Sequence, residues 1–305
     1  MQLEDLRQDD IGTVSAWLPR LGQDANSRVQ LTYPYFAHTA FYYSAQQVEH
    51  LEYSKGNIRQ GTSIQMSVGM WFISIEAFIN TILKISCLIT GKSFLDFRTK
   101  DLGARIVGLF EILRIEKKSF YTGAFQRLGE FKIYRNELFH DRTHEKLLEF
   151  RKTCFGGNPM YANQVDVLQA CVIALETYEA FRYVIADLDL MPQIMVTKDD
   201  SFFFSPLDRL YNYVLRPYFE AVLIKHSLTS SIDLNINSIP LETSSVSLPN
   251  DVRVIVKAVP DEKFNHLAND RETHIGKELF EKIRAEEIFD TANHFKTANY
   301  HRTYK

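Results

Sequence analysis

The sequence predicts a mainly α-helical protein, in which an antiparallel helical bundle is followed by a smaller α+β unit. The chain has 305 residues, of which 45% are hydrophobic, and its 22 Phe and 15 Tyr supply ample apolar surface for a packed core. Between residues 31 and 190, apolar side chains recur at steps of three and four, the spacing of one helical face. After residue 191, two short segments instead alternate between apolar and polar side chains, which is typical of strands.

Three parts are therefore expected along the chain. They are a leading segment (1–30), the bundle (31–190) and the smaller unit (191–305), which is either a domain or an elaboration on the bundle. Within the leading segment we expect a helix around residues 3–18 and a turn near Gly22.

Five helices are expected in the bundle. The first covers about 35–57, which contains no Gly or Pro before Gly56. The second covers about 63–90 and ends at Gly91, the residue type that favours a helix C-terminus. The third covers about 102–115, with a core face made by Ile106, Leu109, Phe110 and Leu113. The fourth covers about 124–139, with Leu128, Phe131, Tyr134 and Leu138 on its core face. The fifth covers about 163–188, and its core face is made by Val165, Leu168, Val172, Leu175, Tyr178, Ile185 and Leu188. Short connections between such helices favour an antiparallel bundle.

Residues 64–89 are apolar and about as long as a membrane-spanning helix. However, Glu76, Asn80 and Lys84 occur there at intervals of four, so they share one helical stripe. Because charged groups near the centre of a bilayer are costly, we expect a buried helix of a soluble bundle rather than a small integral-membrane protein. No signal peptide is expected from the acidic N-terminus, and three widely spaced cysteines fit a reducing compartment, so the predicted location is cytoplasmic.

The C-terminal part contains mixed elements. A helix is expected to begin at Ser205-Pro206 and to reach about residue 225, and strands are expected over 232–236 and 252–258. A charged helix should follow over about 272–289. The tail from residue 293 interleaves cations with aromatic side chains, which suits single-stranded RNA but is also common in solvated tails.

One short segment contains the residue types that RNA cleavage needs. The net charge of −3 does not fit a protein that coats long nucleic acid, so any RNA chemistry must use a local site. His suits removal of a proton from the 2′-hydroxyl, and Arg suits stabilisation of charge on phosphate. Arg135, Asn136 and His140 provide both groups and an orienting amide within six residues. This triplet is expected by chance roughly 0.02 times in a chain of this composition.

The segment from Arg135 to His140 resembles the Arg-polar-x(3–5)-His motif of HEPN domains. The helix around Glu76 is also similar to the second helix of that family, and the resemblance covers residues 31–190. It implies an all-α fold and a homodimer whose two motifs form one composite, metal-independent ribonuclease site. It also implies a role in toxin–antitoxin, abortive-infection or antiviral defence systems, with a regulatory or antitoxin protein as a further partner. Some relatives have lost activity and serve as binding modules.

Helix geometry favours a composite site. On an ideal helix Asn136 and His140 share a face, whereas Arg135 and His140 lie about 140° apart. Either the helix loosens near His140 or a second subunit supplies the missing group. If neither holds, Arg135 and His140 are ordinary surface residues beside a core stripe.

Three further residues are candidates for supporting roles. Glu76 either holds Arg135 or tunes His140, or it is a buried carboxylate paired with Lys84 or with backbone donors. Arg142 is a candidate phosphate contact. His144 repeats the four-residue spacing from His140, but nothing nearby completes a metal-ligand set, so no metal is expected. No cofactor is expected either, because the chain has no Gly-rich phosphate loop.

The leading hypothesis is thus a dimeric endoribonuclease that leaves 2′,3′-cyclic phosphate ends on RNA. The alternative is a non-catalytic interaction or nucleotide-binding module built on the same bundle.

Overall fold

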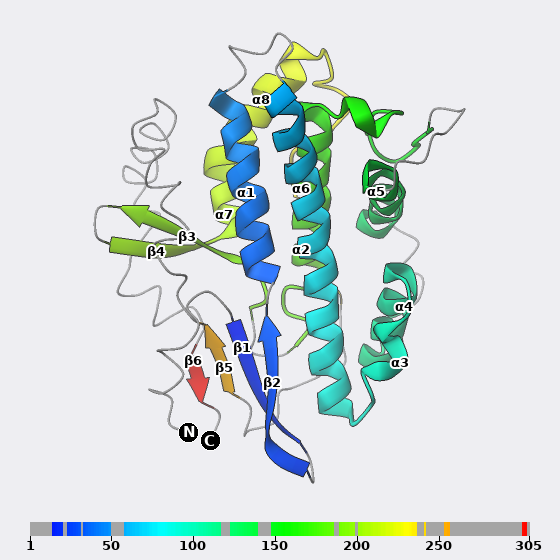
Figure 1. Cartoon of the computed structure of the whole chain (residues 1–305), viewed down its shortest axis with the longest axis vertical. Coiled ribbons are helices and arrows are strands. Elements are labelled where there is room, and N and C mark those ends of the chain that lie inside the picture. The colour runs from blue at the N-terminus through cyan, green and yellow to red at the C-terminus, as the bar shows by residue number, and fades with distance from the viewer. Residues whose placement is uncertain are drawn as a thin grey trace.

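Long helices make up most of the part of the chain that the structure describes. The structure is a computed structural model, and it describes residues 14–20, 23–31, 33–49, 58–116, 123–139, 148–185, 189–198, 201–236, 241, 253–256 and 301–303. Its helices are α1 (Tyr33–Glu49), α2 (Ile58–Thr90), α3 (Leu95–Arg98), α4 (Leu102–Leu113), α5 (Ala124–Phe139), α6 (Gln164–Phe181), α7 (Leu207–Leu210) and α8 (Arg216–Lys225). Figure 1 shows α1, α2 and α6 side by side, with α4 and α5 on the far side of α2. The predicted mainly helical architecture is confirmed at this level.

The core lies between α2 and the helices around it. Helix α6 is buried along almost all of its length, from Val165 to Phe181. Aromatic rings fill the contact between these two helices, where Phe78 packs edge-on against Tyr178 with ring centroids 4.9 Å apart. The hydroxyl groups of Ser74 and Tyr178 are hydrogen-bonded within this apolar setting. This pairing satisfies polar groups that would otherwise be costly to bury.

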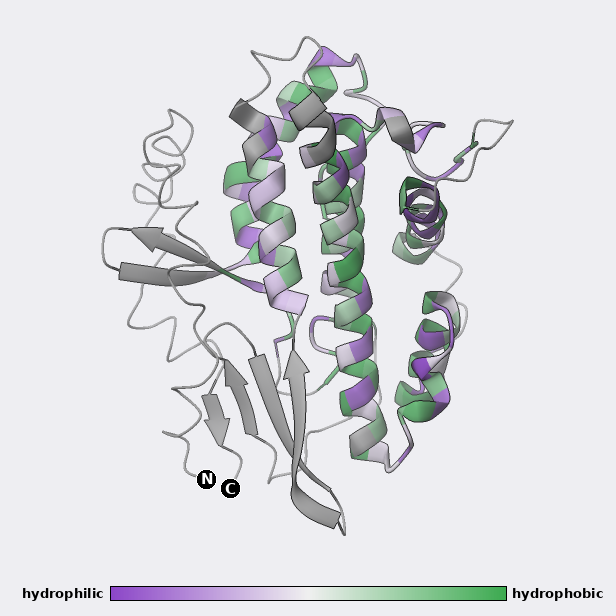
Figure 2. Ribbon diagram, viewed as in Figure 1, coloured by the Kyte–Doolittle hydropathy of each residue, from purple (hydrophilic) through white to green (hydrophobic). Residues whose placement is uncertain are grey.

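Helix α2 is the membrane-length segment. Within the described residues, the stretch Ser63–Cys87 is the one that is long and apolar enough to cross a bilayer, and 67% of its apolar window is buried inside the protein. In Figure 2 this helix carries long hydrophobic stretches broken by shorter hydrophilic ones. The polar residues contact neighbouring elements: Asn80 accepts a hydrogen bond from Arg105 at 3.0 Å, and the Lys84 ammonium lies 5.2 Å from the ring centroid of Phe94. Asn80 and Lys84 of the predicted polar stripe therefore contact α4 and the residue that precedes α3.

The end of α2 follows from its last residues. Gly91 has φ +68°, a left-handed conformation that costs glycine little because it has no Cβ. The amide of Lys92 then donates to the carbonyl of Cys87 at 2.8 Å, which satisfies one of the free carbonyls at the helix end. The predicted end of this helix at Gly91 is confirmed.

The leading segment differs from its prediction. Residues 14–20 and 23–31 form two antiparallel strands, β1 (Val14–Arg20) and β2 (Gln23–Leu31), so the helix expected over 3–18 is wrong from residue 14 onward. The rest of that expected helix lies outside the described residues. Strand β1 also pairs with β5 (Arg253–Val256), so the strand expected over 252–258 is confirmed for residues 253–256, and the rest of that range lies outside the described residues. The physical reason is that β1 lies between β2 and β5, whose backbones satisfy its amide and carbonyl groups from both sides.

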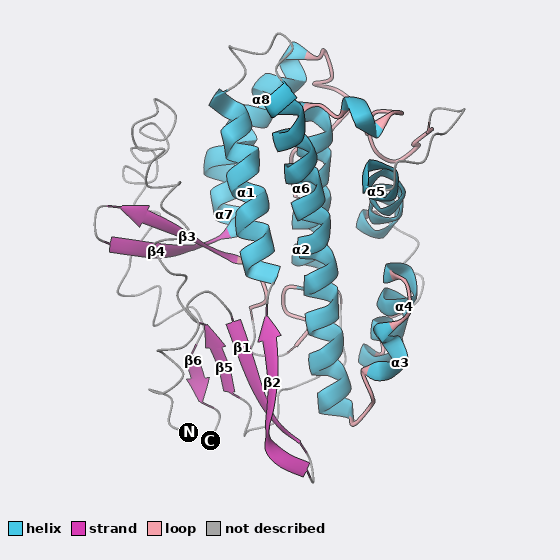
Figure 3. Cartoon of the chain, viewed as in Figure 1, coloured by secondary structure: helices cyan, strands magenta, loops and turns pink. Residues whose placement is uncertain are grey.

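A four-stranded sheet results, in the order β2-β1-β5-β6, where β6 (His301–Thr303) comes from the C-terminal tail. The remainder of that tail and the helix expected over 272–289 lie outside the described residues. A separate hairpin is formed by β3 (Gln193–Lys198) and β4 (Ser201–Pro206), which the sequence analysis missed. Figure 3 shows that the strands gather on one side of the helical part.

The region after β4 is partly as predicted. The expected helix from Ser205-Pro206 to residue 225 is confirmed as α7, a π-helical turn (Tyr211–Leu215) and α8. The strand expected over 232–236 is wrong, because the carboxylate of Asp233 accepts a hydrogen bond from the amide of Asn235 at 2.8 Å and makes a turn. Ile232 and Leu234 are nevertheless buried, which explains their alternation with polar residues.

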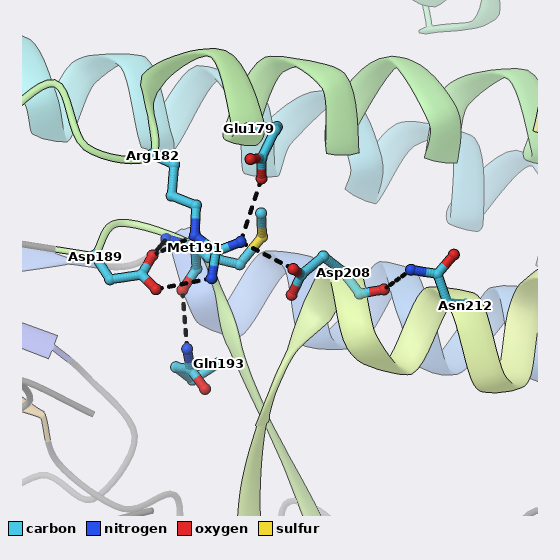
Figure 4. A network of polar contacts seen from close by, with 7 residues as sticks. All are labelled: Glu179, Arg182, Asp189, Met191, Gln193, Asp208 and Asn212. Carbon is cyan, nitrogen blue, oxygen red and sulfur yellow. Dashed lines mark hydrogen bonds and ion pairs between the residues drawn. The ribbon is translucent and has the colours of Figure 1, made fainter. Parts of the chain in front are cut away.

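An ion-pair network joins the end of α6 to the C-terminal helices. Arg182 donates to both carboxylate oxygens of Asp189, at 3.0 and 2.9 Å, and to Asp208 of α7 at 2.9 Å. It also donates to Glu179 at 3.3 Å, as Figure 4 shows. Helix α6 ends at Phe181, whereas the sequence predicted that it would continue to residue 188. Turns and bends follow over residues 182–185. Arg182 thus fastens α7 to the bundle at the point where α6 stops.

Candidate functional site

The predicted motif lies where α5 packs against α2. On α2, Gly69, Phe72 and Glu76 follow at steps of three and four and so share one face. Phe139 of α5 approaches Gly69, whereas Arg135, one turn earlier, approaches Glu76. The two helices therefore run in opposite directions at this contact, as expected of neighbours in an antiparallel bundle.

Arg135 is held from several sides. Its Nη2 lies 3.9 Å from Oε2 of Glu76, and its Nη1 donates to Oδ1 of Asn136 at 3.1 Å. The guanidinium carbon lies 5.2 Å from the ring centroid of Phe72 and 5.5 Å from that of Phe139. Both distances fall in the range of cation–π contacts. With its side chain 25% exposed, Arg135 is fixed in direction but still reaches solvent.

Glu76 contacts Arg135, one of the partners that the sequence suggested for it. It faces Arg135, and its side chain is 29% exposed, so it is a half-buried rather than a fully buried carboxylate. The ammonium of Lys84 lies instead over the ring of Phe94. The structure therefore places Glu76 beside the arginine of the motif.

Three of the predicted site residues, His140, Arg142 and His144, lie outside the described residues. Helix α5 extends to Phe139, the residue directly before His140. The peptide bond alone therefore places His140 next to Phe139, whose ring contacts Arg135. The roles of these three residues stay predictions.

The chain after the motif returns to α5. The carboxylate of Glu130 accepts hydrogen bonds from the backbone amides of Arg151 and Lys152, at 2.9 and 3.0 Å, and from the hydroxyl of Thr153 at 2.8 Å. Residues 140–147 thus connect the end of α5 to a segment that is tied to the middle of the same helix. The described segment that follows the motif in the sequence is therefore anchored to α5 at Glu130.

Aromatic stacking strengthens that attachment. Tyr134 of α5 stacks on Phe155, with ring centroids 4.4 Å apart and planes 17° apart. Behind them, Asp166 accepts hydrogen bonds from the amides of Gly156 and Asn163, both at 2.7 Å. Burial raises the pKa of Asp166, and these two amides oppose the rise because they stabilise the charged carboxylate. Asp166 therefore supports the α5 side of the site rather than facing the motif.

Metal ligation finds no support in the part of the chain that the structure describes. No group of three His, Cys, Asp or Glu side chains there is placed to hold an ion. Cys87 and Cys171 are buried, and burial raises the pKa of the Cys87 thiol to about 11 and that of Cys171 well above its ordinary value. Neither thiol is a nucleophile in this state.

Three residues of the site were missed by the sequence analysis: Gly69, Phe72 and Phe139. Phe72 precedes Glu76 by four residues, and Phe139 follows Arg135 by four. Side chains four apart on a helix are neighbours, so this spacing was the available signal. Gly69 carries no such signal, because its role depends on the approach of Phe139 from another helix.

Comparison with known proteins identifies no relative: no family model, no curated protein and no solved structure matches the chain. The class of protein is therefore defined by the fold and the site alone. It is a mainly helical protein with an Arg-Asn pair held at the end of a bundle helix.

Proposed function

We propose that this protein is a metal-independent endoribonuclease of the HEPN type. The observation that carries the proposal is the placement of Arg135, whose guanidinium lies against two aromatic rings and 3.9 Å from Glu76, while its side chain remains 25% exposed. In the sequence Arg135 precedes His140 by five residues. A cation fixed in this way binds a phosphate with little loss of side-chain entropy.

The proposed chemistry uses the RNA's own 2′-hydroxyl as the nucleophile. His140 removes the proton of that hydroxyl, which attacks the adjacent phosphorus, and the bond to the 5′-oxygen breaks. Arg135 stabilises the charge that builds on the phosphate oxygens, and Asn136 orients the guanidinium to which it is hydrogen-bonded. The leaving 5′-oxygen takes up a proton, so the products are a 2′,3′-cyclic phosphate and a 5′-hydroxyl.

The proposal includes a homodimer with a composite site. Arg135 and His140 would lie about 140° apart if α5 continued unchanged through His140. The pair therefore faces one phosphate only if the backbone leaves the helix there or if a second copy supplies one of the two groups. A cytoplasmic defence or toxin setting, with a protein that restrains the enzyme, follows from the HEPN resemblance and is part of the same proposal.

A second candidate is a non-catalytic interaction module. The observation that favours it is that two apolar side chains of α5 reach solvent, since Ile133 is 49% and Phe139 is 47% exposed. Such side chains suit a protein interface as well as a substrate. In that case Arg135 is a structural partner of Glu76 and cleaves nothing.

The decisive experiment is RNA cleavage in EDTA by the wild type, Arg135→Ala and His140→Ala. We expect cleavage by the wild type and losses of at least about 100-fold in both variants. Arg216→Ala is the matched control, because Arg216 forms an exposed ion pair with Glu220 on α8, away from the motif. Activity that survives both motif substitutions, or that the chelator alone abolishes, rules out the mechanism.

Toxicity on expression separates the two candidate functions. The nuclease predicts that the wild type harms its host whereas His140→Ala is tolerated. Equal tolerance of both, together with no cleavage, favours the interaction module.

A further inference from the structure

Phe139 is an exposed aromatic side chain at the end of α5, beside the arginine of the motif. It is 47% exposed, which is unusual for a phenylalanine in a protein with so large an apolar core. Its ring edge rests on α2, where a Cβ built at Gly69 would lie 2.4 Å from Cζ of Phe139. The guanidinium of Arg135 lies 5.5 Å from the ring centroid. The ring is thus fixed along one edge and backed by a cation, while about half of it faces solvent.

A second exposed aromatic residue with a neighbouring arginine allows a comparison. Tyr183 is 56% exposed, and the guanidinium carbon of Arg182 lies 5.3 Å from its ring centroid. The difference is charge. Arg182 contacts the three carboxylates of Glu179, Asp189 and Asp208, so one positive charge faces three negative ones. Among the described residues, Arg135 is ion-paired with one carboxylate, that of Glu76, at 3.9 Å.

These surroundings favour different ligands. Counting the described residues, a phosphate that approaches Tyr183 meets a net excess of negative charge, whereas a phosphate that approaches Phe139 meets a cation paired with one carboxylate at 3.9 Å. An aromatic face beside an available cation is the combination that binds single-stranded nucleic acid, through a stacked base and its adjacent phosphate.

We propose that Phe139 stacks on a base of single-stranded RNA, next to the phosphate that Arg135 contacts. This inference rests on the proposed function for its substrate, and it adds the strandedness of the RNA and a base-binding residue. Stacking uses the π-face that every base carries, so the contact is sequence-tolerant. A base inside a duplex is covered by its neighbours, so the site selects unpaired nucleotides.

The first test measures binding without cleavage. A short 2′-O-methyl oligoadenylate of roughly ten nucleotides has a blocked nucleophile and stays intact in a binding titration. We expect Phe139→Leu to weaken its binding by about tenfold, and Phe139→Trp to restore it. Leucine keeps the apolar character of the surface and removes the aromatic face, so a protein-contact role predicts no loss. Circular dichroism melting checks that both variants are folded.

The second test separates stacking from an effect on Arg135. The same titrations use an oligomer with the same sugar–phosphate backbone but without bases. Stacking predicts that wild type and Phe139→Leu bind this oligomer equally, because the group that Phe139 contacts is gone. A penalty of the same size with and without bases would mean that Phe139 acts through Arg135, and it would overturn the proposal.

Tyr183→Leu is the matched control and should bind oligoadenylate as the wild type does. Equal losses in Phe139→Leu and Tyr183→Leu, or no binding by the wild type, also overturn the proposal. The proposed function fails separately, if no RNA is cleaved. Binding that depends on Phe139 without cleavage would define a single-strand RNA-binding protein, so the two failures are distinguishable.

Discussion

The carboxylate of Glu76 and the guanidinium of Arg135 face each other across the α2–α5 contact at 3.9 Å, and both side chains are partly exposed. A long, half-exposed ion pair contributes at most about 1 kcal/mol, so a phosphate competes effectively for the same guanidinium. Glu76→Gln should therefore tighten RNA binding, by about two- to fivefold at low salt. The measurement is a titration with 2′-O-methyl RNA at several salt concentrations.

Asp101→Asn is the control for that substitution. Asp101 forms an ion pair at 3.4 Å with Lys132, which is also on α5. Its removal changes the net charge by the same amount, so an equal gain in both variants would indicate a general charge effect. Weaker binding by Glu76→Gln would contradict the competition and assign Glu76 a positioning role.

Arg127 and Glu176 join α5 to α6 through two hydrogen bonds, at 2.9 and 2.6 Å. Because the Glu176 side chain is 7% exposed, Arg127→Met leaves a nearly buried carboxylate without its partner. We expect the free energy of unfolding at neutral pH to fall by about 3 kcal/mol, as measured in urea. Arg127→Met combined with Glu176→Met should lose less than the single substitution, because no unpaired charge remains.

The same pair predicts a pH dependence. Burial raises the pKa of Glu176, and Arg127 opposes that rise. Without Arg127 the carboxyl is harder to ionise when folded, so the loss is largest near neutral pH. It should shrink as the pH falls through the raised pKa of Glu176 in the folded variant and then through that in the folded wild type. Below the ordinary carboxyl pKa it should vanish, because folded and unfolded chains both hold the proton. A loss that is constant with pH would mean that packing, and not charge, explains it.

Asp166 gives an independent pH test. Burial holds its pKa above the ordinary carboxyl value, so the folded protein keeps the proton to a higher pH than the unfolded chain does. As the pH rises from that ordinary value through the raised one, the unfolded state is favoured and this group lowers the free energy of unfolding. Across this pH window the unfolding free energy of the wild type should therefore fall relative to that of Asp166→Asn, which has no carboxyl group at this position. A shift in the opposite direction would show that the amides of Gly156 and Asn163 outweigh burial.

Two helical glycines should respond differently to alanine. A Cβ at Gly129 of α5 meets nothing within 4 Å, so Gly129→Ala should raise the unfolding free energy by about 0.5–1 kcal/mol. At Gly69 the same methyl group collides with the ring of Phe139, which must move. Gly69→Ala should therefore raise the unfolding free energy by less than Gly129→Ala does. It should also weaken RNA binding, as Phe139→Leu does. Identical behaviour of the two alanine variants in both assays would contradict the contact between Gly69 and Phe139.

Local pattern was enough to predict the long helices. The steps of three between Leu128, Phe131 and Tyr134 helped to predict α5 over 124–139, and these side chains are all buried. The left-handed backbone at Gly91 similarly matches the end predicted for α2. These features depend on residues within one or two turns of each other, which is the range that a periodic pattern samples.

The strands were harder to predict than the helices. The hairpins β1–β2 and β3–β4 join segments that are neighbours along the chain, yet neither hairpin was expected, whereas β5 was. Strand β1 pairs with β5, more than two hundred residues away along the chain, and the helix expected over 3–18 took no account of that partner. Alternation at Ile232 and Leu234 suggested a strand, yet it arises from two buried side chains in a turn that Asp233 stabilises. Alternation alone does not separate these two cases.

The sequence alone determined that this protein is mainly helical and that Arg135, Asn136 and His140 lie within six residues on or beside one helix, because both properties belong to single segments. The tertiary structure decided what surrounds Arg135: the carboxylate of Glu76, the ring of Phe72, and Phe139 resting on Gly69. Those contacts depend on the angle at which α2 and α5 cross and on which residues of each helix lie at the crossing point. Packing of the whole core sets that crossing, and no pattern within either helix specifies it.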